Sequence, residues 1–515
     1  MTKNMIKYLK YNRITWERGI SIVRLEHESK YLEYKRAKKS LPKDFWETYS
    51  SFANTDGGTV ILGVTDDLQI EGVENPIKIQ NELVTILNNR QKINVNLLSD
   101  KNITVKEIEG KQIIEIVIPE AKISQKPVYT NQNPKQSWIR EFEADRKATE
   151  EELKAMLRNS QDDMDSDLLD GFDLNDLDEE TIAEYKILLS KLNERYQSMS
   201  DLDMLIEIGA FKRDRSVRDR VEYKLTIGGL LFFGKYNSIT SAHGLQNFHL
   251  DYFNYIGSEN RWTDRVAPGE AAYPNINIFS FYRIVLNKLV MTIDSNFKLN
   301  NELLRTNYTK AIGVALREAL ANSLIHADYF SEDSVKIEAH STYYKFFNPG
   351  KMKISIEEFV KGGNPKPRNH TITTLFRKVG ISERAGSGGP QIFASAEQNK
   401  LNFPDIELNN NSTMLKIWKV DIVEAHPELS NPEKEILRLL TKELLPLNSK
   451  EIRERTNLSK YYFDKSIKNL ISKNFIEQIG RGRATKYRLQ LGTTEYLTSL
   501  QRMFNVLQNY HLKKQ

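Results

Sequence analysis

The chain has 515 residues, and its 74 basic and 69 acidic side chains give a formal net charge of +5. This length exceeds the usual domain size of roughly 100–200 residues, so we expect several domains. The absence of cysteine excludes disulfides, thiolate zinc sites and cysteine nucleophiles, and no apolar run is long enough to span a membrane. The basic, polar N-terminus lacks the apolar centre of a signal peptide. Together these features predict a multidomain cytoplasmic protein with no membrane-bound part.

The first domain, which we place at residues 1–160, has the pattern of an α/β unit. Residues 31–36 alternate like a strand, which puts the acidic and basic side chains of this stretch on one face. A helix with an aromatic face follows, and residues 59–64 form an apolar strand of the buried type. A hairpin is predicted over residues 103–118.

Three stretches of this domain, ESKYLEYK, SFANTDGGTVILGVTDD and SWIREFEADRKATEEEL, resemble the AlbA-like domain of Schlafen proteins and their prokaryotic relatives. In Schlafen nucleases, two glutamates five residues apart and an aspartate after the Gly-Val strand form a metal-dependent RNA-cleaving site. The resemblance implies Glu28, Glu33 and Asp66 as ligands of Mg²⁺ or Mn²⁺, with Lys35 and Asp67 beside them in the catalytic site. The alternative is a solvated ion pair on the strand and an ordinary turn after it, in a domain that only binds nucleic acid.

Residues 161–180 are predicted to be an acidic linker. The stretch carries ten acidic side chains and no basic one, so it repels itself and resists packing. A solvated spacer is one interpretation, and an acidic strip that competes with nucleic acid for a basic groove is the other.

A connector domain is expected at residues 181–300, with a helical start and a β-rich segment over 223–233. Gly229 to Lys235 has the spacing of a phosphate-binding P-loop. We reject that reading because the interior of the stretch is bulky and apolar and Tyr236 stands where a Mg²⁺-binding Ser or Thr belongs. The segment is therefore predicted to be a core strand.

A polar stripe marks the helix predicted over residues 317–329. Glu318, Asn322 and His326 recur every fourth residue and share one face, among small and apolar neighbours. Because buried polar groups cost free energy unless they are paired, a phosphate–metal ligand would explain the stripe. The alternative is an amphipathic helix with a stray polar stripe.

Two further motifs follow this helix. Asn348-Pro349-Gly350 ends an apolar strand in a turn, and Gly386-Ser387-Gly388-Gly389 leads into another helix. Glycine-rich turns before helices let backbone N–H groups approach an anion.

In this order the three motifs resemble the nucleotide pocket of the GHKL ATPases, in the divergent form found in bacterial ATP-binding transcriptional regulators. The resemblance implies that Asn322 holds Mg²⁺, that Glu318 polarises the attacking water and that the 386–389 loop closes over the phosphates of ATP. His326 and the Asn348-Pro349-Gly350 turn would complete the pocket. The sequence departs from the usual adenine box because Asn348 replaces the aspartate, so an amide carbonyl would have to accept the hydrogen bond of the base.

The order of elements predicted over residues 426–490, three helices and a two-stranded wing, is typical of a winged helix. Basic side chains on its third helix and wing tip suit phosphate contacts with nucleic acid: Lys460, Lys465, Lys468, Arg481 and Arg483. The alternative is a module for protein contacts. Residues 491–515 are predicted to be a terminal helix, and with it we expect a homo-oligomer.

These parts make an α/β multidomain chain: an AlbA-like domain, the linker, the connector, a GHKL-type α/β sandwich at 301–425, the winged helix and the terminal helix. One hypothesis is an ATP-regulated, metal-dependent endonuclease acting on RNA, tRNA or DNA in antiphage defence or stress. The other is an ATP-responsive DNA-binding regulator that cuts nothing. Both require ATP with Mg²⁺ or Mn²⁺ and a nucleic-acid partner.

Overall fold

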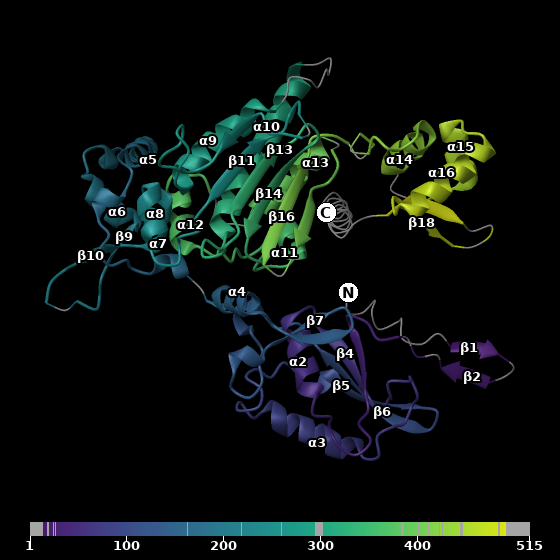
Figure 1. Cartoon of the computed structure of the whole chain (residues 1–515). Coiled ribbons are helices and arrows are strands. Elements are labelled where there is room, and N and C mark those ends of the chain that lie inside the picture. Colours follow the sequence, from purple (N-terminus) through teal and green to yellow (C-terminus); the bar gives the residue numbers. More distant parts are fainter. Residues whose placement is uncertain are drawn as a thin grey trace, which may run out of the picture. The chain divides into compact units, whose positions relative to one another are not determined.

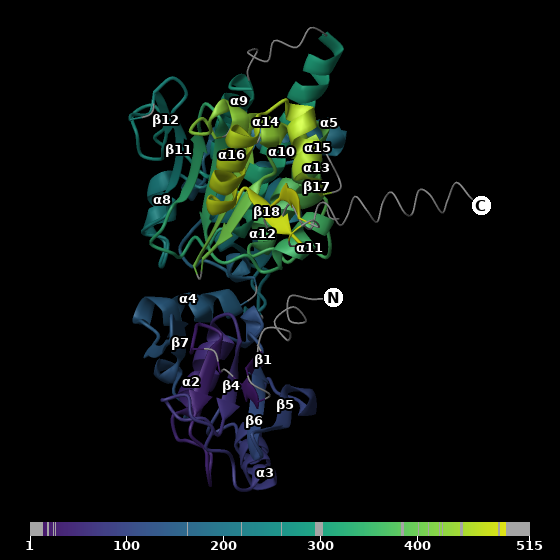
Figure 2. The same ribbon diagram turned by 90° about the vertical axis from the view of Figure 1, so that its right-hand side faces the viewer.

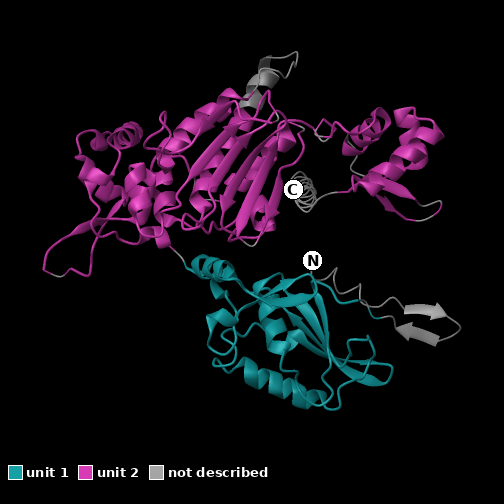
Figure 3. Ribbon diagram, viewed as in Figure 1, with its two compact units in different colours: residues 1–162 teal, residues 163–515 magenta. Residues whose placement is uncertain are grey.

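The computed structural model (Figure 1) describes residues 14–17, 20–23, 25, 27–161, 163–217, 219–258, 260–293, 302–382, 386–399, 401–409, 411–421, 423–424, 426–442, 446–480, 482 and 485–490. The chain divides into two compact units, residues 1–162 and 163–515 (Figure 3). Both units mix helices with sheets, which confirms the predicted α/β multidomain fold class. Among the described residues, no helix is both long enough and apolar enough to cross a membrane.

The first unit is built on a four-stranded sheet of order β3-β4-β6-β5. Strands β3 and β4 are parallel, and α2 makes the crossover that a parallel pair needs, whereas β6 pairs antiparallel with both β4 and β5. The aromatic face of α2 packs into the sheet's core through Phe45, Tyr49 and Phe52. The elements of this unit are β1 (Ile14–Glu17), β2 (Ile20–Val23), β3 (Leu32–Lys35), α2 (Phe45–Asn54), β4 (Gly58–Leu62), α3 (Pro76–Leu87), β5 (Ile103–Ile108), β6 (Lys111–Ile118), β7 (Trp138–Glu141), β8 (Ala144–Lys147) and α4 (Glu150–Ser160).

The second unit is built on a six-stranded sheet of order β12-β11-β13-β14-β16-β15. Only the β11–β13 pair is parallel. Helices α10 and α13 lie side by side on this sheet, and α9 packs against α10 (Figure 1 and Figure 2). The elements up to β16 are α5 (Glu179–Leu192), α6 (Asp201–Ile208), β9 (Phe211–Arg213), β10 (Tyr223–Leu225), α7 (Ile227–Phe233), α8 (Tyr236–Ser241), β11 (Leu250–Asn254), β12 (Asp264–Val266), α9 (Ile278–Met291), α10 (Glu302–His326), β13 (Val335–Ala339), β14 (Tyr343–Pro349), α11 (Ile356–Lys361), α12 (His370–Lys378), α13 (Gly388–Gln398), β15 (Asp405–Leu408) and β16 (Ser412–Trp418).

The prediction of a core strand over residues 223–233 is wrong for most of that segment. Only β10 is extended, and α7 follows it as a helix in which every residue is buried. The Thr226 side chain caps this helix by accepting a hydrogen bond from Gly229 N, and Gly229 packs so close to the Ala210 carbonyl that a Cβ would lie 2.5 Å from it. An apolar run buried on all sides has no periodicity that separates a strand from a helix.

The acidic segment also differs from its prediction, because residues 163–180 pack into the second unit. Asp165 is 0% exposed, and its carboxylate accepts hydrogen bonds from Thr371 N at 3.2 Å and Ile372 N at 2.9 Å, at the start of α12. Leu177 is fully buried in the same core. The prediction counted the charges and overlooked the apolar side chains between them, and it overlooked that a carboxylate is stabilised at a helix N-terminus.

We expect Asp165 to make the stability of the second unit depend on pH. Burial, with a smaller contribution from Asp163, raises the pKa of Asp165 to about 7 from 3.8, against the two backbone N–H bonds, which lower it. A folded-state pKa above the unfolded value adds stability that is complete below the unfolded pKa and is lost as the pH rises through the folded one. The free energy of unfolding should therefore fall between about pH 4 and about pH 7, at about 1.4 kcal/mol per unit of pKa difference.

The variant Asp165→Asn isolates this contribution, because asparagine keeps an acceptor oxygen but does not titrate in this range. Thermal unfolding of the chain and of Asp165→Asn at about pH 5 and about pH 8 should show the aspartate form losing stability relative to the asparagine form as the pH rises. Parallel pH profiles of the two proteins would contradict the assignment.

The C-terminal part contains α14 (Asn431–Lys442), β17 (Leu447–Asn448), α15 (Ser449–Thr456), α16 (Lys460–Ser472), β18 (Ile476–Ile479) and β19 (Lys486–Leu489). The three strands form a sheet of order β17-β19-β18. Asn448 caps α15 by accepting a hydrogen bond from Glu451 N. Arg481, Arg483 and residues 491–515 lie outside the described residues.

Candidate functional site

The polar stripe of α10 meets the start of α13. Glu318, which is 5% exposed, and Asn322 lie one turn apart on α10. Gly388 begins α13 directly against them: a Cβ on Gly388 would lie 2.9 Å from both Glu318 Oε2 and Asn322 Nδ2. The fold thus brings together the carboxylate, the amide and the glycine loop of the predicted nucleotide site.

The segment around Gly362 and Gly363 packs against the glycine loop at residues 386–389. A Cβ on Gly386, whose φ is +62°, would overlap the Gly363 carbonyl, and a Cβ on Gly389 would overlap the Phe359 carbonyl. Only glycine allows the two loops to approach this closely. Sequence reasoning missed the Gly362-Gly363 pair, because nothing in the sequence indicates which loop it faces.

A pocket of about 610 Å³ opens where these two loops meet. Its lining combines both glycine loops with the polar side chains of Lys361, Asn364, Ser387 and Gln391. Glu318 and Asn322 do not line this pocket. Glycine backbone and a lysine are groups that suit an anion such as a phosphate.

The turn at the end of β14 is held by Arg368, another residue that sequence reasoning missed. Gly350, with a φ of +102°, lies against the Arg368 guanidinium, so that a Cβ would be 2.8 Å from Nη2. Arg368 donates to the His326 carbonyl at 3.0 Å and to the Lys351 carbonyl at 2.9 Å. Arg368 thereby ties this turn to the last residue of α10.

The predicted residues His326 and Asn348 lie around the same turn. Burial, with the positive charges of Arg368 and Lys353, lowers the pKa of His326 to about 4, so its imidazole is neutral at neutral pH. Asn348 is buried at the end of β14, and its amide Nδ2 donates to the Pro349 carbonyl at 3.3 Å. His326 and Asn348 therefore contribute uncharged groups beside this turn.

The donor set around Gly388 fits a magnesium–phosphate group. Asn322 carries an amide oxygen and Glu318 a carboxylate, which are the oxygen ligands that Mg²⁺ accepts alongside phosphate and water, and Glu318 Oε1 also lies 3.5 Å from Arg317 Nη2. Bound there, the ion would neutralise phosphate charge, while the glycine loops would supply backbone N–H groups. The residues therefore suit a nucleotide with its magnesium ion.

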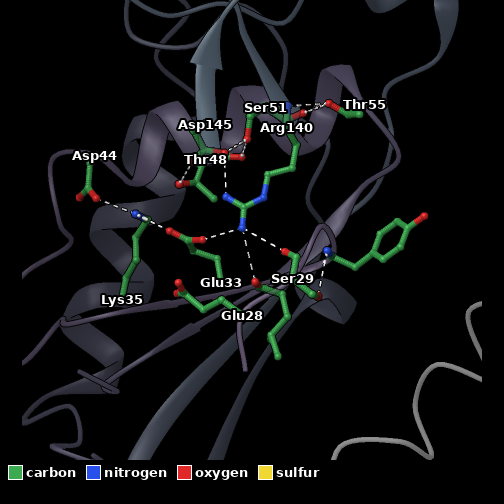
Figure 4. A network of polar contacts seen from close by, with 12 residues as sticks. Glu28, Ser29, Glu33, Lys35, Asp44, Thr48, Ser51, Thr55, Arg140 and Asp145 are labelled. Carbon is green, nitrogen blue, oxygen red and sulfur yellow. Dashed lines mark hydrogen bonds and ion pairs between the residues drawn. The ribbon is translucent and has the colours of Figure 1, made fainter. Parts of the chain in front are cut away.

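A separate polar cluster occupies the first unit, with Arg140 at its centre (Figure 4). The Arg140 side chain is 1% exposed, and it donates to Glu33 Oε2 at 2.8 Å, to Asp145 Oδ1 at 2.9 Å and to the Ser29 carbonyl at 3.0 Å. Lys35 Nζ bridges Glu33 Oε1 at 3.2 Å and Asp44 Oδ2 at 2.6 Å. Two cations thus share the carboxylate of Glu33.

Side chains of α2 and of the residue that follows it form further hydrogen bonds around Arg140. Thr48 and Ser51 of α2 donate to Asp145 at 2.6 and 2.5 Å, and Thr55 Oγ1 accepts from Arg140 N (Figure 4). Burial raises the pKa of Glu33, while the positive charges of Lys35 and Arg140 oppose that shift. Sequence reasoning missed Arg140 and Asp145, because each belongs to a hairpin far from Glu33 in the chain.

Of the three predicted metal ligands, Glu28 and Glu33 lie near one another (Figure 4), and Asp66 lies in the turn after β4. Glu28 Oε1 accepts a hydrogen bond from Tyr34 N at 2.8 Å, while Asp66 and Asp67 are exposed in the turn after β4. No group of three His, Cys, Asp or Glu side chains that could hold a metal ion occurs in the described part of the chain. The ion pair of Glu33 and Lys35 is local, as in the alternative that the sequence left open, but it is largely buried rather than solvated, and Asp66 and Asp67 lie in an exposed turn.

The lysines predicted to contact nucleic acid lie on the outer face of α16. Lys460, Lys465 and Lys468 are exposed, and Tyr461 and Tyr462 are exposed beside them. No carboxylate among the described residues pairs with these lysines. Their charges are therefore open to a negatively charged partner.

Three family models match parts of the chain. Residues 28–149 match "Schlafen, AlbA_2", residues 332–417 match "Putative ATP-dependent DNA helicase recG C-terminal", and residues 154–251 match a domain of unknown function (DUF8451). The last match includes the acidic segment that packs into the second unit. No curated protein matches the chain.

Two solved structures are similar to the chain. One is the DIP2311 protein from Corynebacterium diphtheriae, at 14% identity, covering 89% of this chain and 95% of that one with a TM-score of 0.38. The other is the N-terminal domain of a RecG-related protein from Nitrosomonas europaea, at 26% identity, covering 19% and 71% with a TM-score of 0.16.

The family matches confirm both resemblances predicted from the sequence. The chain combines a Schlafen-type AlbA_2 domain with an ATPase module of the kind found at the RecG C-terminus.

Proposed function

We propose that the chain is an ATP-binding protein that associates with nucleic acid, and that its nucleotide state controls this association. The observation that carries the proposal is the contact of Gly388 with the side chains of Glu318 and Asn322. This contact joins the polar helix to the glycine loop, as the resemblance to the GHKL nucleotide pocket implies. The family matches to an AlbA_2 domain and to a RecG-type C-terminal module support the same reading.

The nucleic-acid contact is proposed to lie on α16. The elements from α14 to β19 are three helices, a short strand β17 between the first two, and the hairpin of β18 and β19, which is similar to the order of a winged helix. In that interpretation α16 would be the recognition helix. Its three open lysines suit phosphate oxygens, and phosphate contacts set affinity rather than sequence preference. Within the two functions that the sequence left open, this favours an ATP-responsive regulator that binds duplex DNA.

We expect Lys460→Glu, Lys465→Glu and Lys468→Glu, made together, to weaken duplex binding strongly. Each lost phosphate contact lowers the slope of log affinity against log salt by about 0.9, so three should lower it by about 2.7. Fluorescence anisotropy of a labelled duplex at several salt concentrations, with and without ATP and Mg²⁺, measures both the affinity and its dependence on nucleotide.

A charge-matched control separates a specific contact from net charge. Lys191, Lys310 and Lys336 are exposed on other elements of the second unit, and their replacement by glutamate changes the net charge equally. Equal losses in the two triple variants would reject α16 as the contact surface. An affinity that ATP leaves unchanged would reject nucleotide control.

A second candidate function is a metal-dependent endonuclease. The match of residues 28–149 to the Schlafen AlbA_2 model favours it, together with the presence of Glu28 and Glu33 at the matching spacing. This candidate needs a divalent cation at Glu33.

A further inference from the structure

We propose that Arg140 and Lys35 are the permanent counter-ions of Glu33, and that this cluster takes no divalent metal ion. The inference concerns the first unit alone and does not rest on the proposed nucleotide site. It separates the two functions that the sequence left open, because the endonuclease needs a divalent cation at Glu33.

The first argument is the occupancy of the carboxylate. Glu33 Oε2 lies 2.8 Å from Arg140 Nη2, and Glu33 Oε1 lies 3.2 Å from Lys35 Nζ. A metal ion bound to either oxygen would stand next to one or both of these cations and be repelled by them. The repulsion would be strong because the Glu33 side chain is largely buried, where charges are poorly screened.

The second argument is that Arg140 is fixed. Its guanidinium is held by Glu33, Asp145 and the Ser29 carbonyl, and it lies over the Phe52 ring at 5.0 Å from the centroid. Because an arginine cannot lose its proton in a protein, Arg140 cannot become neutral to admit a metal ion. Moving it aside would leave Asp145 buried without its positive partner, and an unpaired buried charge is strongly unfavourable.

The third argument concerns the other two ligands that the Schlafen resemblance implies. Glu28 uses an oxygen to accept the Tyr34 backbone N–H, which fixes the carboxylate beside the strand. Asp66 is exposed, and its charge acts on Arg36, which forms an ion pair with Glu71 at 2.7 Å. Glu28 lies near Glu33, but Glu33 already has two cationic partners, and no third acidic side chain joins them in the described part of the chain; this is fewer oxygen ligands than Mg²⁺ or Mn²⁺ needs.

The test is a titration of the full chain with Mn²⁺ in the absence of nucleotide. The electron paramagnetic resonance signal of the free ion measures how much Mn²⁺ stays unbound. Three proteins are compared: the unaltered chain, Glu33→Gln and Asn322→Ala. Glutamine keeps an acceptor for Arg140, and circular dichroism checks that the variant is folded. We expect no Mn²⁺ binding that depends on Glu33, so the unaltered chain and Glu33→Gln should give the same titration curve.

Each outcome decides the question. Binding that Glu33→Gln abolishes overturns the proposal and favours the endonuclease. Binding that only Asn322→Ala abolishes belongs to the second unit, and binding that neither variant changes lies elsewhere; both leave the proposal standing. Because the readout is metal binding in the first unit, it can fail while the nucleotide and duplex experiments succeed, and the reverse also holds.

A cleavage assay on labelled RNA and single-stranded and duplex DNA with Mn²⁺ gives a second, independent readout. We expect no cleavage that differs between the unaltered chain and Glu33→Gln. Cleavage lost in Glu33→Gln would overturn the proposal even if the metal bound too weakly for the titration.

Discussion

Replacing Arg140 by methionine should lower the free energy of unfolding of the first unit by about 3–5 kcal/mol, the usual cost of removing one partner from a buried ion pair. The loss would leave Asp145 without its positive partner and Glu33 with Lys35 alone, while both carboxylates stay largely buried. Urea unfolding followed by hydrogen exchange in peptides from α2 and β4 measures the change in this unit specifically.

Arg146→Met is the matched control for this variant. Arg146 lies on the neighbouring strand and pairs with two glutamates, Glu141 and Glu152, but its side chain is 37% exposed. Exposed ion pairs contribute about 0–1 kcal/mol, so this control should change stability little. Similar losses in the two variants would show that Arg140 is not the buried hub of the domain.

Gly388→Ala should lower the affinity for ATP with Mg²⁺ by at least about tenfold, which corresponds to about 1.4 kcal/mol. The added methyl group would lie 2.9 Å from both Glu318 Oε2 and Asn322 Nδ2, so these side chains would have to move from their positions on α10. Isothermal titration calorimetry with a non-hydrolysable ATP analogue and Mg²⁺ measures the affinity, and the rise in melting temperature with ligand provides a second measure.

Gly313→Ala is the control, because Gly313 is another glycine in α10 whose added Cβ would meet only Ile293 Cδ1, at an ordinary 3.9 Å. Alanine in a helix interior should raise stability and leave nucleotide affinity unchanged. If Gly388→Ala binds the nucleotide as tightly as the unaltered chain, ATP does not bind at the contact of Gly388 with Glu318 and Asn322, and the proposed site is wrong.

The residues of the proposed nucleotide site could be singled out in the sequence because their pattern is local. Glu318 and Asn322 share a helix face by their spacing alone, and a glycine run before a helix is visible in the sequence. The expectation that these side chains lie next to the glycine loop at the start of α13 came only from the family resemblance. The Gly362-Gly363 pair was overlooked because a loop that only faces another loop leaves no periodic pattern.

The acidic cluster shows why spacing along a chain does not establish a metal site. The alternation of residues 31–36 correctly places Glu33 and Lys35 on one face of β3. The main partner of Glu33 on that face is Arg140, which lies on a hairpin more than a hundred residues later in the chain. No local pattern in the sequence records such a partner, so the charge balance of the cluster became visible only in three dimensions.

The position of Asp165 has a practical consequence for dissecting this protein. Charge composition would suggest starting a fragment of the second unit after the acidic stretch, near residue 181. Such a fragment would lack the carboxylate that binds the N–H groups of Thr371 and Ile372, and it would expose the core that Leu177 covers. A fragment that begins at residue 163 keeps both, so the most acidic stretch of the sequence belongs inside the boundary of the second unit.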